Sequence, residues 1–88
     1  MPYIEPYARV NLNPSIKAVV KSLDDGGWQV GEVNYVIYKI LLAWWKNEPR
    51  YKTICSIMGT LTSVTQEFYR KVAAEYEQKA ENKNGEIT

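Results

Sequence analysis

The stretch VNYVIYKILLAWW, residues 33–45, decides the fold class, because Asn34 and Lys39 are its only residues that are neither aliphatic nor aromatic. It belongs to a helix predicted over residues 32–46, with Glu32 near the positive helix end and Pro49 as its limit. One face carries Val33, Val36, Ile37, Ile40, Leu41 and Trp44, and the opposite face carries Tyr35, Tyr38, Leu42 and Trp45. A helix that is apolar nearly all round is a buried one, so something must cover both faces.

A shorter helix is predicted upstream, over residues 14–24. Asn13 can cap its first turn, and Pro14 suits the first helical position. Gly26 and Gly27 then end the helix. Residues 1–12, MPYIEPYARVNL, contain two prolines and no helical period, so they are predicted to form an irregular N-terminal arm.

The third predicted helix covers residues 50–82, because apolar residues recur at helical spacing from Ile54 to Val72. It either bends near residues 73–75 or continues as the polar segment EYEQKAENK, and residues 83–88 form a tail with Asn84-Gly85 as a turn signal. The chain is therefore predicted to be a single all-α domain over residues 1–88. We expect a short N-terminal helix and a long two-helix antiparallel hairpin, with an irregular arm and a tail at the ends.

The size of the chain limits what these helices can bury. A domain of this length buries only somewhat more than ~60% of its unfolded surface. The short helix and the arm leave little to cover Tyr38, Leu42 and Trp45, so the cover is either the chain's own arms or a second copy of the chain. Because monomers seldom expose large apolar patches, the sequence favours a homo-oligomer with these three residues at its interface.

The composition argues against catalysis. The chain has no histidine, which removes the commonest general base and a common zinc ligand. The segment DDGG, residues 24–27, lacks the strand, spacing and lysine of a phosphate-binding loop, so a helix-end turn is the simpler interpretation. Cys55 has no accompanying base and is interpreted as a small core residue rather than a nucleophile. We therefore expect no enzyme, no metal site and no cofactor.

The charge and hydropathy patterns narrow the partners. A net charge of +1 without a basic cluster gives no reason to expect DNA or RNA binding. The apolar run is shorter than the ~20 residues of a membrane span. The first residues lack a positive region followed by an apolar core, so no signal peptide is expected. These observations predict a cytoplasmic protein that does not bind membranes.

Amphipathic side chains on the third predicted helix are candidates for ligand binding. Glu67 precedes Arg70 by three residues and Lys71 by four, so it can pair with either. Tyr69 and Tyr76 offer phenol edges, and arginine suits bidentate contacts with phosphate or carboxylate. The arm, folding over the same area, would add Tyr3, Tyr7 and Arg9.

Asn34 is the odd residue of the apolar helix. A buried polar group needs a partner, so Asn34 is expected to bond to something specific. Two partners are open: a structural hydrogen bond to the arm or the chain terminus, or a contact with a ligand.

Several short motifs resemble, in order and spacing, a family of small uncharacterised proteins met largely in bacteriophage genomes and in some prokaryotes. They are MPYI at 1–4, GEVNYVI at 31–37, G-x-L at 59–61, EFYRK at 67–71, YE at 76–77 and NGE at 84–86, and they cover almost the whole chain. The resemblance implies a phage setting rather than a mechanism. Its matching polar positions add Tyr35 and Asn84 to the candidate ligand-binding residues.

The chain departs from the family pattern at two informative places. Glu75 stands where the family has a proline, which favours a longer third helix. Gln78 replaces an aspartate, so a site that needed that aspartate is in doubt here.

Two functions fit these observations. The first is a non-enzymatic, oligomeric phage accessory protein that sequesters a small phosphorylated ligand, such as a host signalling nucleotide, in counter-defence. Tyrosines would stack on the base, and Arg9, Arg70 and Lys71 would hold phosphate. The alternative is a protein–protein interaction module that inhibits or scaffolds a host or phage protein through the aromatic face of the 32–46 helix.

Overall fold

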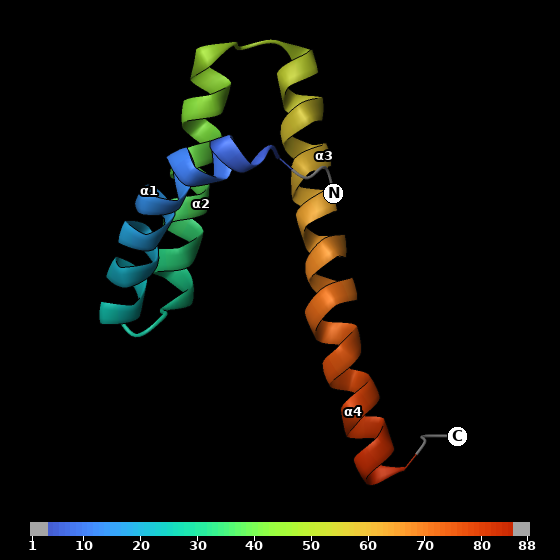
Figure 1. Cartoon of the computed structure of the whole chain (residues 1–88). Helices are drawn as coiled ribbons and strands as arrows, with labels where there is room; N and C mark the ends of the chain where they lie inside the picture. The colour runs from blue at the N-terminus through green and yellow to red at the C-terminus, as the bar shows by residue number, and fades with distance from the viewer. Residues whose placement is uncertain (1–3, 86–88) are drawn as a thin grey trace. The chain divides into compact units, whose positions relative to one another are not determined.

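The computed structural model of the chain describes residues 4–85, which are helical over almost their whole length (Figure 1). The elements are α1 (Pro6–Asp25), α2 (Val30–Asn47), α3 (Tyr51–Phe68), the π-helix η1 (Tyr69–Ala73) and α4 (Ala74–Asn84). No strand occurs among residues 4–85, and the all-α class is confirmed. The chain divides into two units after Thr53, and each is described by itself.

In the first unit, α1 begins at Pro6, eight residues before the predicted start at residue 14. Proline suits the first turn of a helix because its missing N–H would have no partner there. The N–H groups of Ala8 and Arg9 both donate to the carbonyl oxygen of Glu5, at 3.0 and 3.2 Å. The prediction of an irregular arm is therefore wrong for residues 6–12. The rest of the predicted arm includes Tyr3, which lies outside the described residues.

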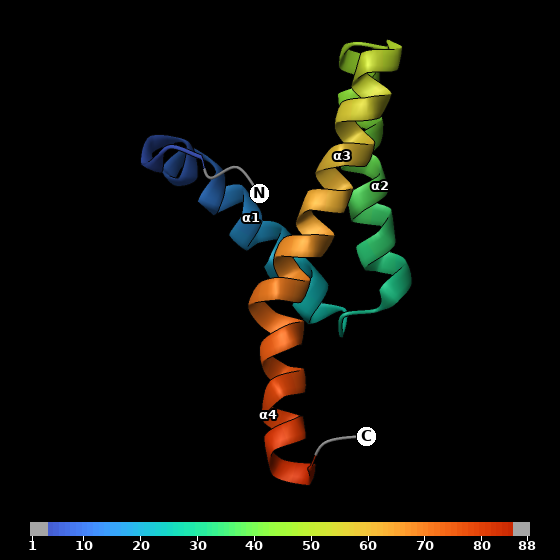
Figure 2. The same ribbon diagram turned by 90° about the vertical axis from the view of Figure 1, so that its right-hand side faces the viewer.

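Pro14 lies inside α1 rather than at its start. It has no N–H to donate to the carbonyl of Val10, and its ring crowds the preceding turn. Figures 1 and 2 show the consequence: the N-terminal part of α1 runs in a different direction from the rest of the helix. The predicted helix start at residues 13–14 thus corresponds to a bend within a longer helix.

A hydrogen-bonded turn joins α1 to α2. The Trp28 N–H donates to the Leu23 carbonyl at 2.9 Å, and the Gly27 N–H donates to the Asp24 carbonyl at 3.0 Å, which is the bond pattern of a Schellman motif. Gly27 has a φ of 81°, where a Cβ is unfavourable. The backbone of Trp28 is also in the left-handed region, with a φ of 58°. Its indole Nε1 donates to Oδ1 of Asp24 at 2.9 Å. The predicted helix-end turn at residues 24–27 is confirmed.

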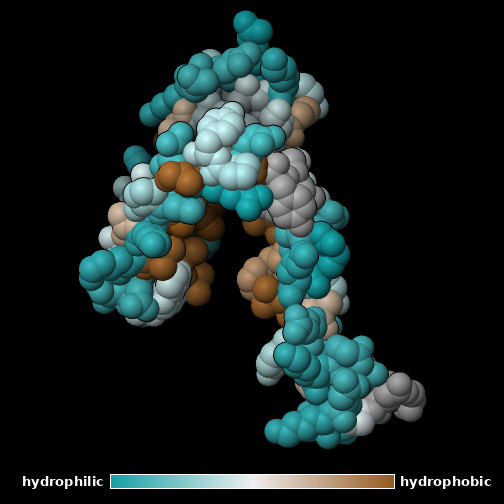
Figure 3. All heavy atoms as spheres, in the orientation of Figure 1, coloured by the Kyte–Doolittle hydropathy of each residue, from teal (hydrophilic) through white to brown (hydrophobic). Residues whose placement is uncertain are grey.

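The second helix, α2, extends slightly beyond its predicted range of 32–46 at both ends. None of its residues is buried, although its composition predicts a buried helix. Val33, Val36, Leu41, Leu42 and Trp45 are half-buried, and its other apolar residues are exposed. Figure 3 shows hydrophobic side chains at the surface over α1 and α2. Among the described residues of this unit, 4–53, Leu23 is the only buried apolar residue, so α1 covers little of α2.

The second unit, residues 54–85 of the described chain, is one helical segment from α3 through η1 to α4. Ile57 is its only buried apolar residue. Cys55 is exposed, so its interpretation as a core residue is wrong. The continuation of the third predicted helix is confirmed. The irregularity within it is the π-helix η1, which covers Tyr69–Ala73 and so begins before the bend predicted near residues 73–75. Gly85, with a φ of 87°, ends α4 and donates its N–H to the Glu81 carbonyl at 2.8 Å. Residues 83 and 84 of the predicted tail are therefore helical.

Candidate functional site

The predicted ligand-binding residues are divided between the two units. The first unit carries Tyr7 and Arg9 on α1 and Asn34 and Tyr35 on α2. The second carries Glu67 on α3, Tyr69, Arg70 and Lys71 on η1, and Tyr76 and Asn84 on α4.

In the second unit, the structure pairs Glu67 with Arg70. Nη2 of Arg70 donates to Oε1 of Glu67 at 2.6 Å. The Glu67 side chain is 15% exposed and that of Arg70 is 65% exposed, so the pair presents its cationic side to solvent. Of the two partners that the spacing allows for Glu67, the structure selects Arg70 and leaves Lys71 exposed on the same π-helix.

The π-helix also brings together two residues whose spacing along the chain does not predict a contact. The Tyr69 hydroxyl donates to Oε2 of Glu77 at 3.2 Å, although the residues are eight apart. In an α-helix, residues seven apart lie nearly one above the other. A π-turn accommodates one extra residue, so eight residues span what seven would otherwise span. Such π-turns are frequent at functional sites.

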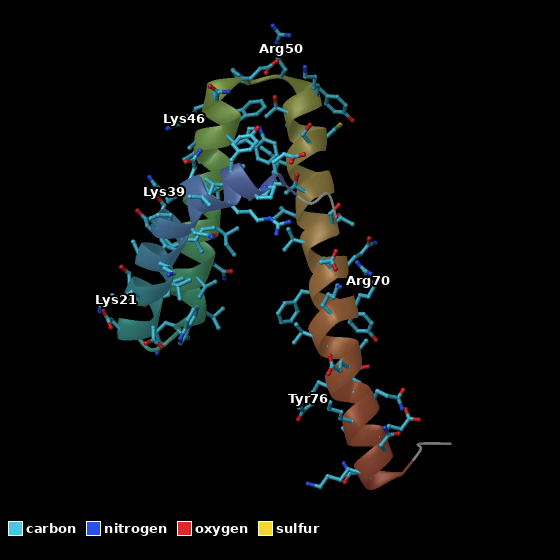
Figure 4. All side chains as sticks on the ribbon, in the orientation of Figure 1. Lys21, Lys39, Lys46, Arg50, Arg70 and Tyr76 are labelled. Atoms are coloured by element: carbon cyan, nitrogen blue, oxygen red, sulfur yellow. The ribbon has the colours of Figure 1, made fainter. Side chains whose placement is uncertain are left out.

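Tyr76 does not join this group. Figure 4 shows Arg70 and Tyr76 pointing to opposite sides of the helical segment. Tyr76 is 74% exposed. Asn84 is the last residue of α4 and is likewise exposed. Within the second unit, the structure therefore assembles Glu67, Tyr69 and Arg70 around the π-helix, with Glu77 as an addition.

In the first unit, two candidate residues, Arg9 and Tyr35, interact with other residues of the chain. Arg9 Nε donates to the carbonyl of Ile4 at 3.2 Å. The Lys39 ammonium lies 5.9 Å from the centroid of the Tyr35 ring, within the range of a cation–π interaction. Asn34 is exposed, and its side chain makes no hydrogen bond to another residue of the described chain. The structural hydrogen bond predicted for Asn34 is thus not found among residues 4–85.

The predicted interface residues on α2 differ in exposure. Tyr38 is 60% exposed, whereas Leu42 and Trp45 are half-buried. All three lie on the face of α2 opposite to Val33, Val36 and Ile40, as the helical spacing predicts.

A concave site that the sequence analysis missed lies between α1 and α2. This α1–α2 notch has a volume of about 330 Å³. Val19, Ser22 and Leu23 line it from α1, and Gly31, Glu32, Tyr35 and Val36 line it from α2. Its only sequence signal is the helical spacing of these residues on either side of the glycine turn. That spacing does not give the angle between the helices.

Two further features of residues 4–85 bear on function. No helix among them is long and apolar enough to cross a membrane. No three of their Cys, Asp and Glu side chains gather in a way that would hold a metal ion.

Together these features define an all-α protein whose long helices expose many apolar side chains. Residues 1–87 match the family described as Domain of unknown function (DUF6899), and the chain belongs to that family. The predicted membership of a small uncharacterised family is thereby confirmed. Comparisons with curated proteins and with solved structures gave no significant match.

Proposed function

We propose that the protein is a non-enzymatic binding protein whose apolar helices are covered by another protein surface, first of all a second copy of the same chain. One observation carries this proposal. Among residues 4–85, only Leu23 and Ile57 are buried apolar residues, whereas twenty-two large hydrophobic or aromatic residues are exposed. Monomeric proteins rarely leave so much apolar surface in contact with water.

The arrangement of α2 and α3 is part of the proposal and rests on spacing along the chain. Each helix carries five apolar residues at alternating three- and four-residue steps, as in a coiled-coil seam. They are Val30, Val33, Ile37, Ile40 and Trp44 on α2, and Ile54, Ile57, Leu61, Val64 and Phe68 on α3. The seams are nearly symmetric about the connection: Val30 lies 17 residues before Asn47 (47 − 30), and Phe68 lies 18 after Arg50 (68 − 50). Such symmetry suits an antiparallel hairpin with a short connection.

Cysteine cross-linking tests the hairpin. In a Cys55→Ser background, Ile37→Cys combined with Leu61→Cys is expected to form an intrachain disulfide, because both positions lie midway along their seams. Tyr38→Cys combined with Leu61→Cys is the matched control, since Tyr38 lies on another face of α2. Equal cross-linking of the two pairs would contradict the hairpin.

A hairpin built on these seams leaves the other face of α2 for a partner. That face carries Tyr38, Leu42 and Trp45, and Tyr and Trp are frequent anchors of protein interfaces. We propose that it forms the self-association surface and that the same face can dock on a host or phage protein. The motif resemblance supports a phage setting and hence the host cytoplasm, and a counter-defence role is part of the proposal.

Native mass spectrometry of the protein purified from bacteria is the decisive experiment, because it reports subunit count and retained small molecules together. A ligand-free oligomer is the result expected for an interaction module. A monomer at all concentrations up to about 100 µM, well above the dissociation constants of most specific interfaces, would overturn the proposal.

Sequestration of a small phosphorylated ligand is a second candidate, favoured by the π-helix. This short segment carries Tyr69, Arg70 and Lys71. The guanidinium of Arg70 lies beside Glu67 and is mostly exposed. A nucleotide phosphate would compete with the Glu67 carboxylate for Arg70, while Tyr69 would stack on the base.

A thermal-shift screen with cyclic and linear nucleotides tests this candidate. Binding at micromolar affinity raises the melting temperature, and Arg70→Ala abolishes the shift. Arg50→Ala is the matched control, because Arg50 is an equally exposed arginine that also pairs with a glutamate, Glu48, at 3.6 Å. If no nucleotide raises the melting temperature, this candidate fails and the interaction module stands alone.

A further inference from the structure

The α1–α2 notch lies wholly within the first unit, so its walls belong to one piece of structure. The hydrogen-bonded turn at residues 24–29 joins the two helices at one end of the notch. The notch volume, about 330 Å³, is at the lower end of the range for small-molecule sites. It is therefore suited to a small group or a single side chain rather than to a whole helix.

The walls of the notch are mainly apolar. Val19 and Leu23 contribute from α1 and Val36 from α2, and Leu23 is one of the few buried residues of the described chain. Gly31 adds no side chain, and a Cβ built there meets nothing within 4 Å. An aliphatic stem entering the notch would thus find apolar contacts without displacing another side chain.

The lining carries one formal charge, the carboxylate of Glu32. A Cβ built on Gly26 would collide with Oε1 of Glu32, which places the carboxylate against the turn. Glu32 makes no ion pair or side-chain hydrogen bond among residues 4–85. The acids of the turn are engaged elsewhere: Asp24 accepts from Trp28, and Asp25 pairs with Lys21 at 3.1 Å.

The nearby cationic side chain of Lys39 does not pair with the Glu32 carboxylate. The Lys39 ammonium stands over the Tyr35 ring rather than beside Glu32. Lys39 is not among the lining residues, although Tyr35 is. The notch therefore combines a carboxylate at the turn, apolar walls and an aromatic side chain at its edge.

From this combination we propose that the α1–α2 notch binds a cation carried on an aliphatic stem, the chemistry of a lysine side chain or of a free alkylamine. Glu32 accepts the ammonium group, and Val19, Leu23 and Val36 pack on the stem. The proposal depends on the proposed function only for the source of the cation, which a partner protein or a second copy would supply as a lysine.

Titration of the ¹⁵N-labelled protein with butylammonium, followed by NMR, tests the site without any partner. We expect saturable shifts of the Gly31 and Val36 amides with a Kd in the millimolar range, as for a probe of five heavy atoms. Butanol, which has the same stem without the charge, is expected to bind at least about twofold more weakly, in keeping with a solvent-accessible ion pair. Glu32→Gln is expected to remove this preference.

A second experiment fills the notch with a side chain of the protein itself. Gly31→Leu places a side chain in the open space and is expected to abolish the shifts caused by both probes. Gly59→Leu is the matched control, because Gly59 is also a helical glycine whose Cβ would meet open space, but it lies in the other unit. Equal affinities for butylammonium and butanol in the unsubstituted protein, or unchanged binding in Gly31→Leu, would overturn the proposal.

A carbodiimide, which joins carboxylates to amines in direct contact, distinguishes the sources of the cation. In the purified protein, a Glu32 link to a lysine of a second copy assigns the source to the chain itself. A link formed only after addition of butylamine assigns it to an amine from outside the chain, either free or on a partner protein. The Glu75–Lys79 pair, at 3.1 Å, is the internal positive control. If that pair links and Glu32 links to no amine, the proposal is wrong, whatever the oligomeric state.

Discussion

The Tyr69 hydroxyl lies 3.2 Å from Oε2 of Glu77, although the two residues are eight positions apart on one helical segment. The π-helix between them, Tyr69–Ala73, accounts for this contact, because its extra residue returns Glu77 to the side of the helix that Tyr69 occupies. The bond runs from the first residue of η1 to the first turn of α4. It therefore connects the irregular segment to the polar helix that follows.

We predict a measurable coupling between Tyr69 and Glu77. In a double-mutant cycle of Tyr69→Phe and Glu77→Ala, the coupling free energy should be about 0.5 kcal/mol, the low end for a hydrogen bond, because both residues are exposed. Hydrogen exchange of the α4 amides is the measurement. Tyr76→Phe in place of Tyr69→Phe should show no coupling, since the Tyr76 hydroxyl makes no hydrogen bond among the described residues. Equal couplings for the two tyrosines would contradict the π-helix geometry.

The two glycines of the α1–α2 turn should differ in their tolerance of alanine. Gly27 has a φ of 81°, and alanine there should lower the free energy of unfolding by about 1–2 kcal/mol. Gly26 has a φ of −84°, and its added Cβ meets only the end of the flexible Glu32 side chain. Gly26→Ala should therefore cost less than about 0.5 kcal/mol, with the reduced freedom of the unfolded chain offsetting part of the cost. Urea unfolding of both variants at one protein concentration checks the order, and a reversed order would contradict the turn.

Replacing Tyr38 should weaken self-association. Tyr38 is 60% exposed on the face of α2 that we assign to the partner, and truncating an aromatic anchor costs about 2 kcal/mol or more. Sedimentation velocity of Tyr38→Ala over a range of concentrations should show a dissociation constant at least about tenfold higher. Tyr51→Ala is the control, because Tyr51 is 78% exposed but lies on the first turn of α3. If both variants associate as the parent does, the interface lies elsewhere.

Pro14→Ala should stabilise the protein. Alanine restores an N–H for the Val10 carbonyl and removes the ring from the interior of α1, where proline costs up to about 3 kcal/mol. We expect a gain of about 1–3 kcal/mol in the free energy of unfolding and more ellipticity at 222 nm. If the helix began at residue 14, the same substitution would not increase the free energy of unfolding, because proline is well tolerated at the first helical position. The measurement thus distinguishes the long α1 from the short helix that the sequence suggests.

The helical class and the limits of α2 were predictable because they depend on strong local signals. The apolar run at residues 33–45, the paired glycines at 26–27 and Asn84-Gly85 each act within a few residues. The start of α1 was missed because Pro2 and Pro6 were interpreted as signs of an irregular arm and Pro14 as the first helical position. In the structure, Pro6 occupies the first turn and Pro14 bends the helix from within.

The candidate site was less predictable than the helices. The Glu67–Arg70 pair follows from three-residue spacing, and the structure confirms it. The Tyr69–Glu77 contact depends on a π-turn, which leaves no mark in composition or periodicity. The α1–α2 notch depends on the angle between two helices, which the dihedral angles of Gly27 and Trp28 determine and which no helical period encodes.

Side-chain hydrogen bonds and ion pairs of short range hold the turn, the π-helix and the helix surfaces. Those described above join residues no more than eight positions apart. Contacts of such short range close small loops and cost little chain entropy before they form. Chains of this kind fold quickly, because the search for distant partners is short. The helices can thus form early in each separate molecule. On the self-association that we propose, most of the resistance to unfolding would arise only when molecules meet. The melting temperature of this protein should therefore rise with its concentration.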